Sequence, residues 1–152
     1  MAFAKKSFGF TLIEVLVVVF IIGLLSSVVL VGLGTFRARG RDARRAADLR
    51  SIQNALELYY QKEGMYPTAT SWSELTSILV GGGIGLSGVP NDPKKGASYD
   101  YAVSSDNERY ILRAELEDVS NTLLNDDVDG SGGETYSINC DDEPNAYYCI
   151  QL

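Results

Sequence analysis

The chain has 152 residues and a formal net charge of −7, which leaves room for one domain with a modest core and some appended segments. The charge is uneven: residues 1–50 carry eight basic and three acidic side chains, whereas residues 51–152 carry five basic and seventeen acidic ones. The acidic C-terminal part argues against nucleic acid as the main partner, and the absence of histidine removes the commonest general base and metal ligand.

The first predicted element is an uncharged apolar segment. Residues 15–34 form a run of twenty residues without a charge, and a helix of that length, at about 1.5 Å per residue, matches a hydrocarbon core of about 30 Å. A cleaved secretory signal normally has a shorter apolar region and a small-x-small cleavage site, so this segment is expected to be retained. Glu14 stands just before it, and a carboxylate beside a membrane span needs a partner.

The helical pattern continues beyond the apolar segment. Leu49, Ile52, Leu56 and Tyr59 are spaced 3, 4 and 3 residues apart, which places them on one helix face. Gly64 is a typical residue to end a helix. We therefore predict one helix from about residue 10 to residue 63, about 80 Å long, half of which must be buried by lipid or by other subunits. Two ion pairs are expected along it, Asp42 with Arg45 and Arg44 with Asp48.

A short helix and a small antiparallel sheet follow. Ser71 with Glu74 forms a capping box before SWSELTSILV, and a run of three glycines ends that helix. The stretches SYDYAV (98–103) and RYILRAELE (109–117) alternate as strands do and are joined by a turn-like SSDNE. YSIN (136–139) and AYYCI (146–150) are weaker strand predictions.

The N-terminus resembles a prepilin. The polar leader MAFAKKSFG ends in glycine and is followed by FTLIEVLVVVFIIG, with phenylalanine first and glutamate fifth. This pattern is similar to the class III signal of type IV pilins and of type II secretion pseudopilins. The later LRSIQNALELYYQKEGMYPT, the VPNDP stretch and the paired predicted strands also resemble this family, more loosely.

The resemblance implies a pilin-like α+β fold, in which one very long N-terminal helix packs on a small antiparallel sheet. It divides the chain into a leader peptide (1–9), an apolar transmembrane or filament-core helix (10–36), an amphipathic helical half (37–63) and a globular head with a C-terminal loop (64–152). It further implies cleavage between Gly9 and Phe10 by a prepilin peptidase and methylation of the new Phe10 amine. Glu14 would then pair with the Phe10 ammonium of a neighbouring subunit and set the register of a helical homopolymer.

The resemblance also implies partners and a location. The subunit would be stored in the inner or cytoplasmic membrane, in contact with lipid, and moved by inner-membrane assembly machinery into an extracellular or periplasmic filament. Two features depart from this expectation. Val31-Gly32-Leu33-Gly34 stands where many family members have a proline, and more basic residues follow the apolar segment than precede it, which by itself favours a cytoplasmic head.

Two further sites are predicted near the C-terminus. Asn125, Asp127 and Asp129 alternate before Gly130 as in a calcium loop, with Ser131 and Glu134 as further ligands; Tyr136 replaces the usual final glutamate, and a solvated acidic turn is the alternative. Calcium is therefore a possible cofactor, and none is required. Cys140 and Cys149 would most simply form one disulfide in an exported chain, and the resulting loop is similar to that of type IV pilins; two free thiols are the alternative.

The remaining clusters are interpreted as structural. The arginine group lies just beyond the apolar segment, where a membrane-surface or inter-subunit role is favoured over DNA binding; it comprises Arg37, Arg39, Arg41, Arg44, Arg45 and Arg50. Four aromatic residues are expected where the sheet packs on the helix, namely Tyr59, Tyr60, Tyr66 and Trp72.

Several functions remain open at this point. A pilus subunit is favoured by the disulfide, and a major pseudopilin of a type II secretion system by the NDP stretch and the calcium-like turn. A single-span membrane protein with a binding domain is an alternative of another class. An enzyme is not expected, because the sequence has no histidine, no glycine-flanked serine elbow and no phosphate-binding glycine loop.

Overall fold

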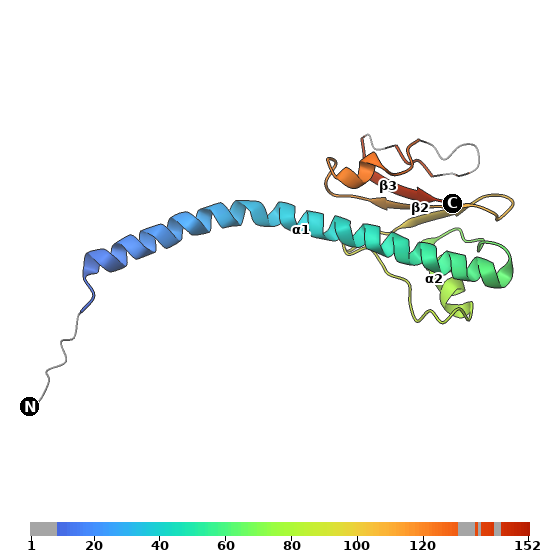
Figure 1. The fold of residues 1–152 in the computed structure, drawn as a ribbon, viewed down its shortest axis with the longest axis horizontal. Helices are drawn as coiled ribbons and strands as arrows, with labels where there is room; N and C mark the ends of the chain where they lie inside the picture. The colour runs from blue at the N-terminus through green and yellow to red at the C-terminus, as the bar shows by residue number, and fades with distance from the viewer. Residues whose placement is uncertain (1–8, 131–135, 137, 142–143) are drawn as a thin grey trace, which may run out of the picture. The chain divides into compact units, whose positions relative to one another are not determined.

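A computed structural model describes residues 9–130, 136, 138–141 and 144–152, with the side chains of residues 28–33 excepted. The chain divides into two compact units, Met1–Arg37 and Ala38–Leu152. Helix α1 covers Leu12–Glu63, so residues 12–37 of this helix belong to the first unit and residues 38–63 to the second (Figure 1). The helix therefore begins two residues later than predicted, because Gly9 and Phe10 precede its first turn.

The first unit consists of the apolar part of α1. Its large apolar side chains from residue 10 to residue 25 are all about half exposed or more, from 49% at Val18 to 82% at Phe10. Within the part of the chain that the structure describes, no helix is both long enough and apolar enough to cross a membrane. The predicted span 15–34 includes residues 28–33, whose side chains lie outside the described part.

The second unit holds the hydrophobic core. Leu49, Ile52 and Leu56 of α1 are completely buried or nearly so, as their 3–4–3 spacing predicts, and Tyr59 is half-buried at the edge of the core. The helix ends at Glu63, followed by Gly64 with a φ of +77° and a hydrogen bond from its backbone N–H to the Tyr60 carbonyl oxygen at 2.8 Å. This is the predicted glycine stop.

Helix α2 covers Trp72–Gly81 and begins as its capping box predicts. The backbone N–H of Glu74 donates to Ser71 Oγ at 3.2 Å, and the Glu74 carboxylate accepts from the Thr70 backbone N–H at 2.8 Å. In a standard capping box the Glu74 carboxylate would accept from the backbone N–H of the N-cap residue Ser71; here it accepts from the residue before it. Leu75 and Leu79 of α2 are fully buried in the core.

The sheet has three antiparallel strands in the order β1–β2–β3, formed by Asp100–Val103, Tyr110–Glu115 and Tyr147–Gln151. These strands confirm three of the four predictions. The fourth, at 136–139, was wrong for the described residues: Tyr136 and Ile138 are irregular, and Asn139 forms a single bridge. Ser137 lies outside the described residues.

The two faces of the sheet pack against different partners. One face carries Leu112, Ala114 and Tyr148, which join the core together with residues 46–56 of α1. The opposite face carries Ile111 and Cys149. Ile138 and Cys140 cover it and form a second, smaller cluster with them. Successive side chains of a strand point to opposite faces of the sheet, so the same strands contribute to both clusters. Between β2 and β3 the chain forms a 3₁₀ turn at Thr122–Asn125.

Aromatic side chains join helix, loop and sheet in the second unit. The rings of Tyr60 and Tyr66 lie 4.7 Å apart between centroids, and Tyr66 lies 4.7 Å from Tyr110 of β2. Trp72 packs edge-on against Tyr99 at 5.2 Å. These contacts confirm the interpretation of the aromatic group as a packing seam.

Candidate assembly and stabilising sites

The predicted processing and assembly residues lie at the start of α1. Gly9 and Phe10 are both exposed and precede the helix, so the peptide bond between them is accessible. Thr11 precedes the first helical residue, and its Oγ accepts a hydrogen bond from the Glu14 backbone N–H at 3.3 Å. In return, a Glu14 carboxylate oxygen accepts long hydrogen bonds of 3.5 Å from the Thr11 backbone N–H and hydroxyl.

Thr11 and Glu14 thus form a capping box within one chain. The T-x-x-E pattern of the sequence is the signal for this partner within the chain. The capping contacts are at the upper limit of hydrogen-bond distance and lie on the exposed surface. They therefore leave the Glu14 carboxylate accessible to a stronger cationic partner.

Arg45 is one of the almost completely buried charges in the described part of the chain, with a side chain that is 1% exposed beside Asp42 at 0%. Three carboxylates from separate segments surround its guanidinium. Asp42 accepts from Nη1 at 2.7 Å and Glu117 from the same nitrogen at 3.0 Å, while Asp92 accepts from Nε at 2.7 Å and Nη2 at 2.9 Å. We call Arg45 with these three residues the Arg45 cluster.

The Arg45 cluster fastens two loops to the helix. Asp92 lies in the loop between α2 and β1, and Glu117 lies just after β2. The Asp42 carboxylate also accepts from the backbone N–H of Glu117 at 2.9 Å and of Asp118 at 3.1 Å. Arg41 adds a bidentate contact to Glu117 at 2.7 and 2.6 Å. Each buried charge is therefore both paired and hydrogen-bonded, as a buried ion requires.

Most of the arginine group contacts carboxylates of its own chain, and its membrane-surface or inter-subunit role stays a prediction. Arg39 binds Asp118 and Arg44 binds Asp48, at 3.1 and 3.6 Å, so four of the six arginines contact carboxylates of their own chain. The pairing of Asp42 with Arg45 was predicted, and it lies on the same helix face as Leu49 and Ile52. Two opposite charges on that apolar face were the sequence signal for a buried ion pair. Asp92 and Glu117 come from distant loops, and residue spacing does not predict that they approach Arg45.

The pKa values of the Arg45 cluster follow from these contacts. Burial disfavours charged Arg45, but the hydrogen bonds that it donates to Asp92, Glu117 and Asp42 together raise its pKa. The hydrogen bond from Arg41, with further contributions from Arg45, lowers the pKa of Glu117 to about 2. Burial opposes ionisation of Asp92, and the Arg45 hydrogen bond overcomes it and lowers the pKa.

Acid is expected to destabilise the second unit through Glu117. Its carboxyl pKa is lower in the folded chain than the usual 4.5, so its stabilising contribution is complete above pH 4.5 and is lost as the pH falls toward 2. Urea unfolding of the wild type between pH 6 and pH 2.5 measures this loss. Glu117→Gln should give a flatter pH profile, and an equally steep profile in that variant would contradict this assignment.

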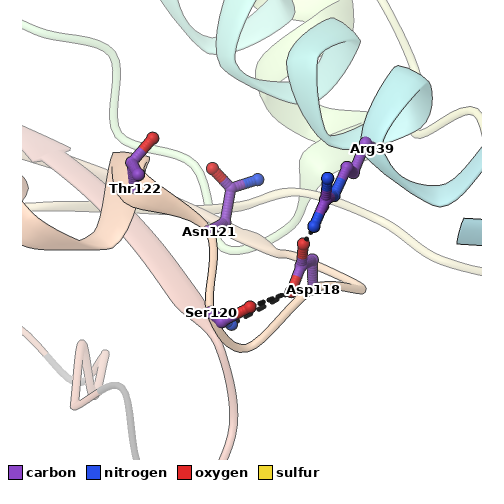
Figure 2. Close-up of a pocket in the computed structure, with 5 residues that line it drawn as sticks. All are labelled: Arg39, Asp118, Ser120, Asn121 and Thr122. Atoms are coloured by element: carbon purple, nitrogen blue, oxygen red, sulfur yellow. Dashed lines mark hydrogen bonds and ion pairs between the residues drawn. The ribbon is translucent and has the colours of Figure 1, made fainter. Parts of the chain in front are cut away.

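A small polar hollow lies around Asp118, the residue that follows Glu117 in the chain (Figure 2). It has a volume of about 300 Å³ and is lined by Arg39, Asp118, Ser120, Asn121 and Thr122. Asp118 accepts from Arg39 Nε at 3.1 Å and from the Ser120 backbone N–H and hydroxyl at 3.1 and 2.7 Å, as the dashed lines in Figure 2 show. The Asp118 carboxylate thus joins its own loop to Arg39 of α1.

Cys140 and Cys149 form the predicted disulfide, with Cα atoms 5.9 Å apart. Both cysteines are completely buried against Ile111 and Ile138 on the second face of the sheet. Arg113 Nη1 also donates to the Asn139 carbonyl oxygen at 2.8 Å, next to Cys140. The disulfide therefore holds the C-terminal cover on β3.

Loss of the disulfide is expected to lower the free energy of unfolding. For a loop of this size the chain-entropy relation gives somewhat under ~3 kcal/mol. Cys140→Ser with Cys149→Ser, compared with the oxidised wild type by urea unfolding, measures the effect. The reduced wild type serves as the control, and a double variant as stable as the oxidised chain would contradict the expectation.

The predicted calcium ligands are described only in part. The Asp127 carboxylate accepts from the Cys149 backbone N–H at 2.7 Å, whereas Asn125 and Asp129 are exposed. Gly130 has the φ of +92° that the predicted sharp turn needs. Ser131 and Glu134 lie outside the described residues, and within the described part no three acidic or cysteine side chains converge on a possible metal position. Calcium binding therefore stays a prediction.

Comparison with known proteins finds one family model and several relatives that match part of the chain. Residues 4–30 match the family model described as the prokaryotic N-terminal methylation motif. The chain is 38% identical over 64 residues to the type II secretion system core protein G of Vibrio cholerae serotype O1. The aligned stretch covers 42% of this chain and 44% of that protein. The corresponding protein of Aeromonas hydrophila is 34% identical over 64 residues, covering 42% and 45%.

A third relative is the type II secretion system core protein G of Escherichia coli K12, 35% identical over 69 residues, which covers 45% of this chain and 48% of that protein. The chain thus spans less than half the length of these curated relatives. No solved structure matches the chain significantly. The family-model match includes Gly9 and Phe10 before α1.

Proposed function

We propose that this protein is a structural subunit of a pilus-like filament. The methylation motif at residues 4–30 and the similar type II secretion proteins support the type IV pilin and type II secretion pseudopilin family. The observation that carries the proposal is the exposed apolar surface next to the methylation motif. Large apolar side chains from residue 10 to residue 25 are at least about half exposed in the single chain, an unusually large apolar surface for a protein to leave in water. Lipid would cover this surface before assembly and other copies afterwards.

Processing and assembly follow from the same segment. A prepilin peptidase would cut between Gly9 and Phe10, which are exposed and precede the helix, and the new Phe10 amine would be methylated. The Glu14 carboxylate would then bind the Phe10 ammonium of the next copy, because its contacts to Thr11 are long and exposed. Repetition of this contact without closure builds a filament, and the role is structural rather than enzymatic.

The same observations favour a major pseudopilin of a type II secretion system equally. Three relatives carry the printed name of type II secretion system core protein G. The Cys140–Cys149 disulfide favours the pilus subunit instead, through its likeness to the C-terminal loop of type IV pilins. Recovery of filaments from the cell surface by shearing indicates a pilus, and retention in the envelope with loss of protein secretion on deletion indicates a pseudopilus.

The first experiment is intact-mass measurement and N-terminal sequencing of the protein from its own host, with electron microscopy of the same fraction. We expect a chain that starts at methylated Phe10 and is present in filaments. A chain that retains Met1 and forms no filaments would refute the proposal. It would favour a single-span membrane-anchored binding domain, with Glu14 acting only as a helix cap.

Calcium is proposed as an optional ligand of the turn at Asn125–Gly130. If it binds, the midpoint of thermal unfolding should rise by several degrees with millimolar calcium and return with a chelator, because a ligand that binds only the folded chain stabilises it. Magnesium at the same concentration is the control. An unchanged midpoint with calcium and with chelator would remove the metal from the function of this protein.

A further inference from the structure

One end of the second unit carries hydrogen-bond donors that its own chain leaves uncommitted. Arg39 is 61% exposed and contacts Asp118 only through Nε within the described residues, which leaves both Nη groups available. Lys94 is exposed and lines the same hollow as Val119, an apolar side chain that is 72% exposed. We call Arg39, Lys94 and Val119 the basic pole.

The other end of the second unit carries carboxylates. The turn between β1 and β2 contains Asp106 and Glu108, both exposed, and it lies beside the end of α1 because the Tyr66 backbone N–H donates to the Asn107 carbonyl oxygen at 2.9 Å. Met65 is 50% exposed there, and its sulfur lies 3.9 Å from the Asn107 amide nitrogen. We call Met65, Asp106 and Glu108 the acidic pole.

The two poles match in chemistry. Each combines one exposed apolar side chain with charged groups of one sign, and Asp106 uses Oδ1 for the contacts to Ser104 and the Glu108 backbone while the structure leaves Oδ2 open. Opposite charges also stand beside each set: Asp118 beside Arg39, Glu115 beside Lys94, and Arg109 beside Glu108. The match therefore lies in the placement of donors, acceptors and apolar contacts and not in net charge.

The poles cannot meet within one chain. From residue 39 to residue 63 the helix rises about 36 Å at 1.5 Å per residue, so the basic and acidic poles lie at opposite ends of the second unit. A surface at one end that is complementary to a surface at the other produces a head-to-tail contact. Such a contact repeats along an open filament.

We propose that the basic pole of one copy docks on the acidic pole of the next copy along the filament axis. Arg39 Nη and Lys94 Nζ bind the carboxylates of Asp106 and Glu108, and Val119 packs against Met65. This contact rests on the proposed filament. It adds a second contact between neighbouring copies, made by their second units and independent of the N-terminal helices. Asp118 holds the loop of Val119 in place through Ser120 and Arg39.

The test is disulfide trapping in assembled filaments of the full chain. Val119→Cys with Met65→Cys should give a ladder of covalent multimers on a non-reducing gel after mild oxidation. The matched control is Val119→Cys with Ser51→Cys, an exposed position in the middle of the same helix, which should give no ladder. Filaments without a ladder in the first variant would overturn the contact and leave the filament itself intact.

Charge reversal tests the same contact without new cysteines. Lys94→Glu should reduce the amount of filament by about two- to fivefold, the change in association constant that corresponds to one exposed ion pair, and adding Glu108→Lys should restore it. Arg50→Glu, an exposed arginine of the same helix outside either pole, should have no effect. Failure of the second change to restore a defect in the first would overturn the pairing, and absence of filaments in the wild type would overturn both proposals.

Discussion

Arg45→Met is expected to lower the free energy of unfolding of the second unit by about 3–5 kcal/mol, the usual cost of breaking a buried ion pair by removing one partner. The guanidinium is 1% exposed and is the common partner of Asp42, Asp92 and Glu117. Its removal leaves three carboxylates close together, two of them almost completely buried. The measurement is urea unfolding near pH 7, with the midpoint and slope fitted separately.

Arg44→Met is the matched control for this prediction. Arg44 lies one residue away on the same helix and contacts Asp48 at 3.6 Å, but its side chain is 60% exposed. An exposed pair contributes about 0–1 kcal/mol, so this variant should stay close to the wild type. Equal effects of the two substitutions would mean that the burial of the Arg45 cluster has no energetic consequence.

Glu14→Ala is expected to leave cleavage after Gly9 intact and to reduce filament formation by more than tenfold. Loss of the carboxylate leaves a neighbouring Phe10 ammonium without its partner in a low-dielectric filament core, at a cost of several kcal/mol, and each 1.4 kcal/mol corresponds to a factor of ten. The measurement is electron microscopy and sedimentation of filaments, with N-terminal sequencing of the same sample.

Glu14→Gln separates this role from helix capping. Glutamine still accepts the hydrogen bond from the Thr11 backbone N–H, and Glu or Gln serves at that position of a capping box, but it carries no charge. If Glu14 sets the subunit register through its charge, the Gln and Ala variants should be equally defective. Near-normal filaments from Glu14→Gln would show that the capping contact to Thr11 is the function of this residue.

The predictions from sequence succeeded where a short stretch carries its own signal. The 3–4–3 spacing at Leu49, Ile52 and Leu56 specifies one helix face, and Gly64 is placed where a left-handed φ ends the helix. The capping box at Ser71 and Glu74 identifies the start of α2. The Gly9-Phe10 junction with Glu14 predicted the family that the comparisons then support.

The calcium prediction depends on more than a local pattern and stays a prediction. Asn125, Asp127 and Asp129 alternate along the chain, but a metal site also needs side chains that converge, and the Asp127 carboxylate accepts from the backbone N–H of Cys149 in β3. The strand expected at 136–139 was wrong for the described residues. That segment covers the second face of the sheet around Cys140 rather than extending the sheet, and the disulfide to Cys149 decides where it lies.

The sequence by itself determined the local elements, the apolar N-terminal segment and the processing motif, because each depends on residues within a few positions of one another. Only the tertiary structure decided the partners of the charges. Arg45 meets Asp92 and Glu117 across 47 and 72 positions of the chain, and no spacing rule connects residues so far apart. Their contact exists because the α2–β1 loop and the end of β2 both return to the same turn of α1, where burial makes each charge require the others.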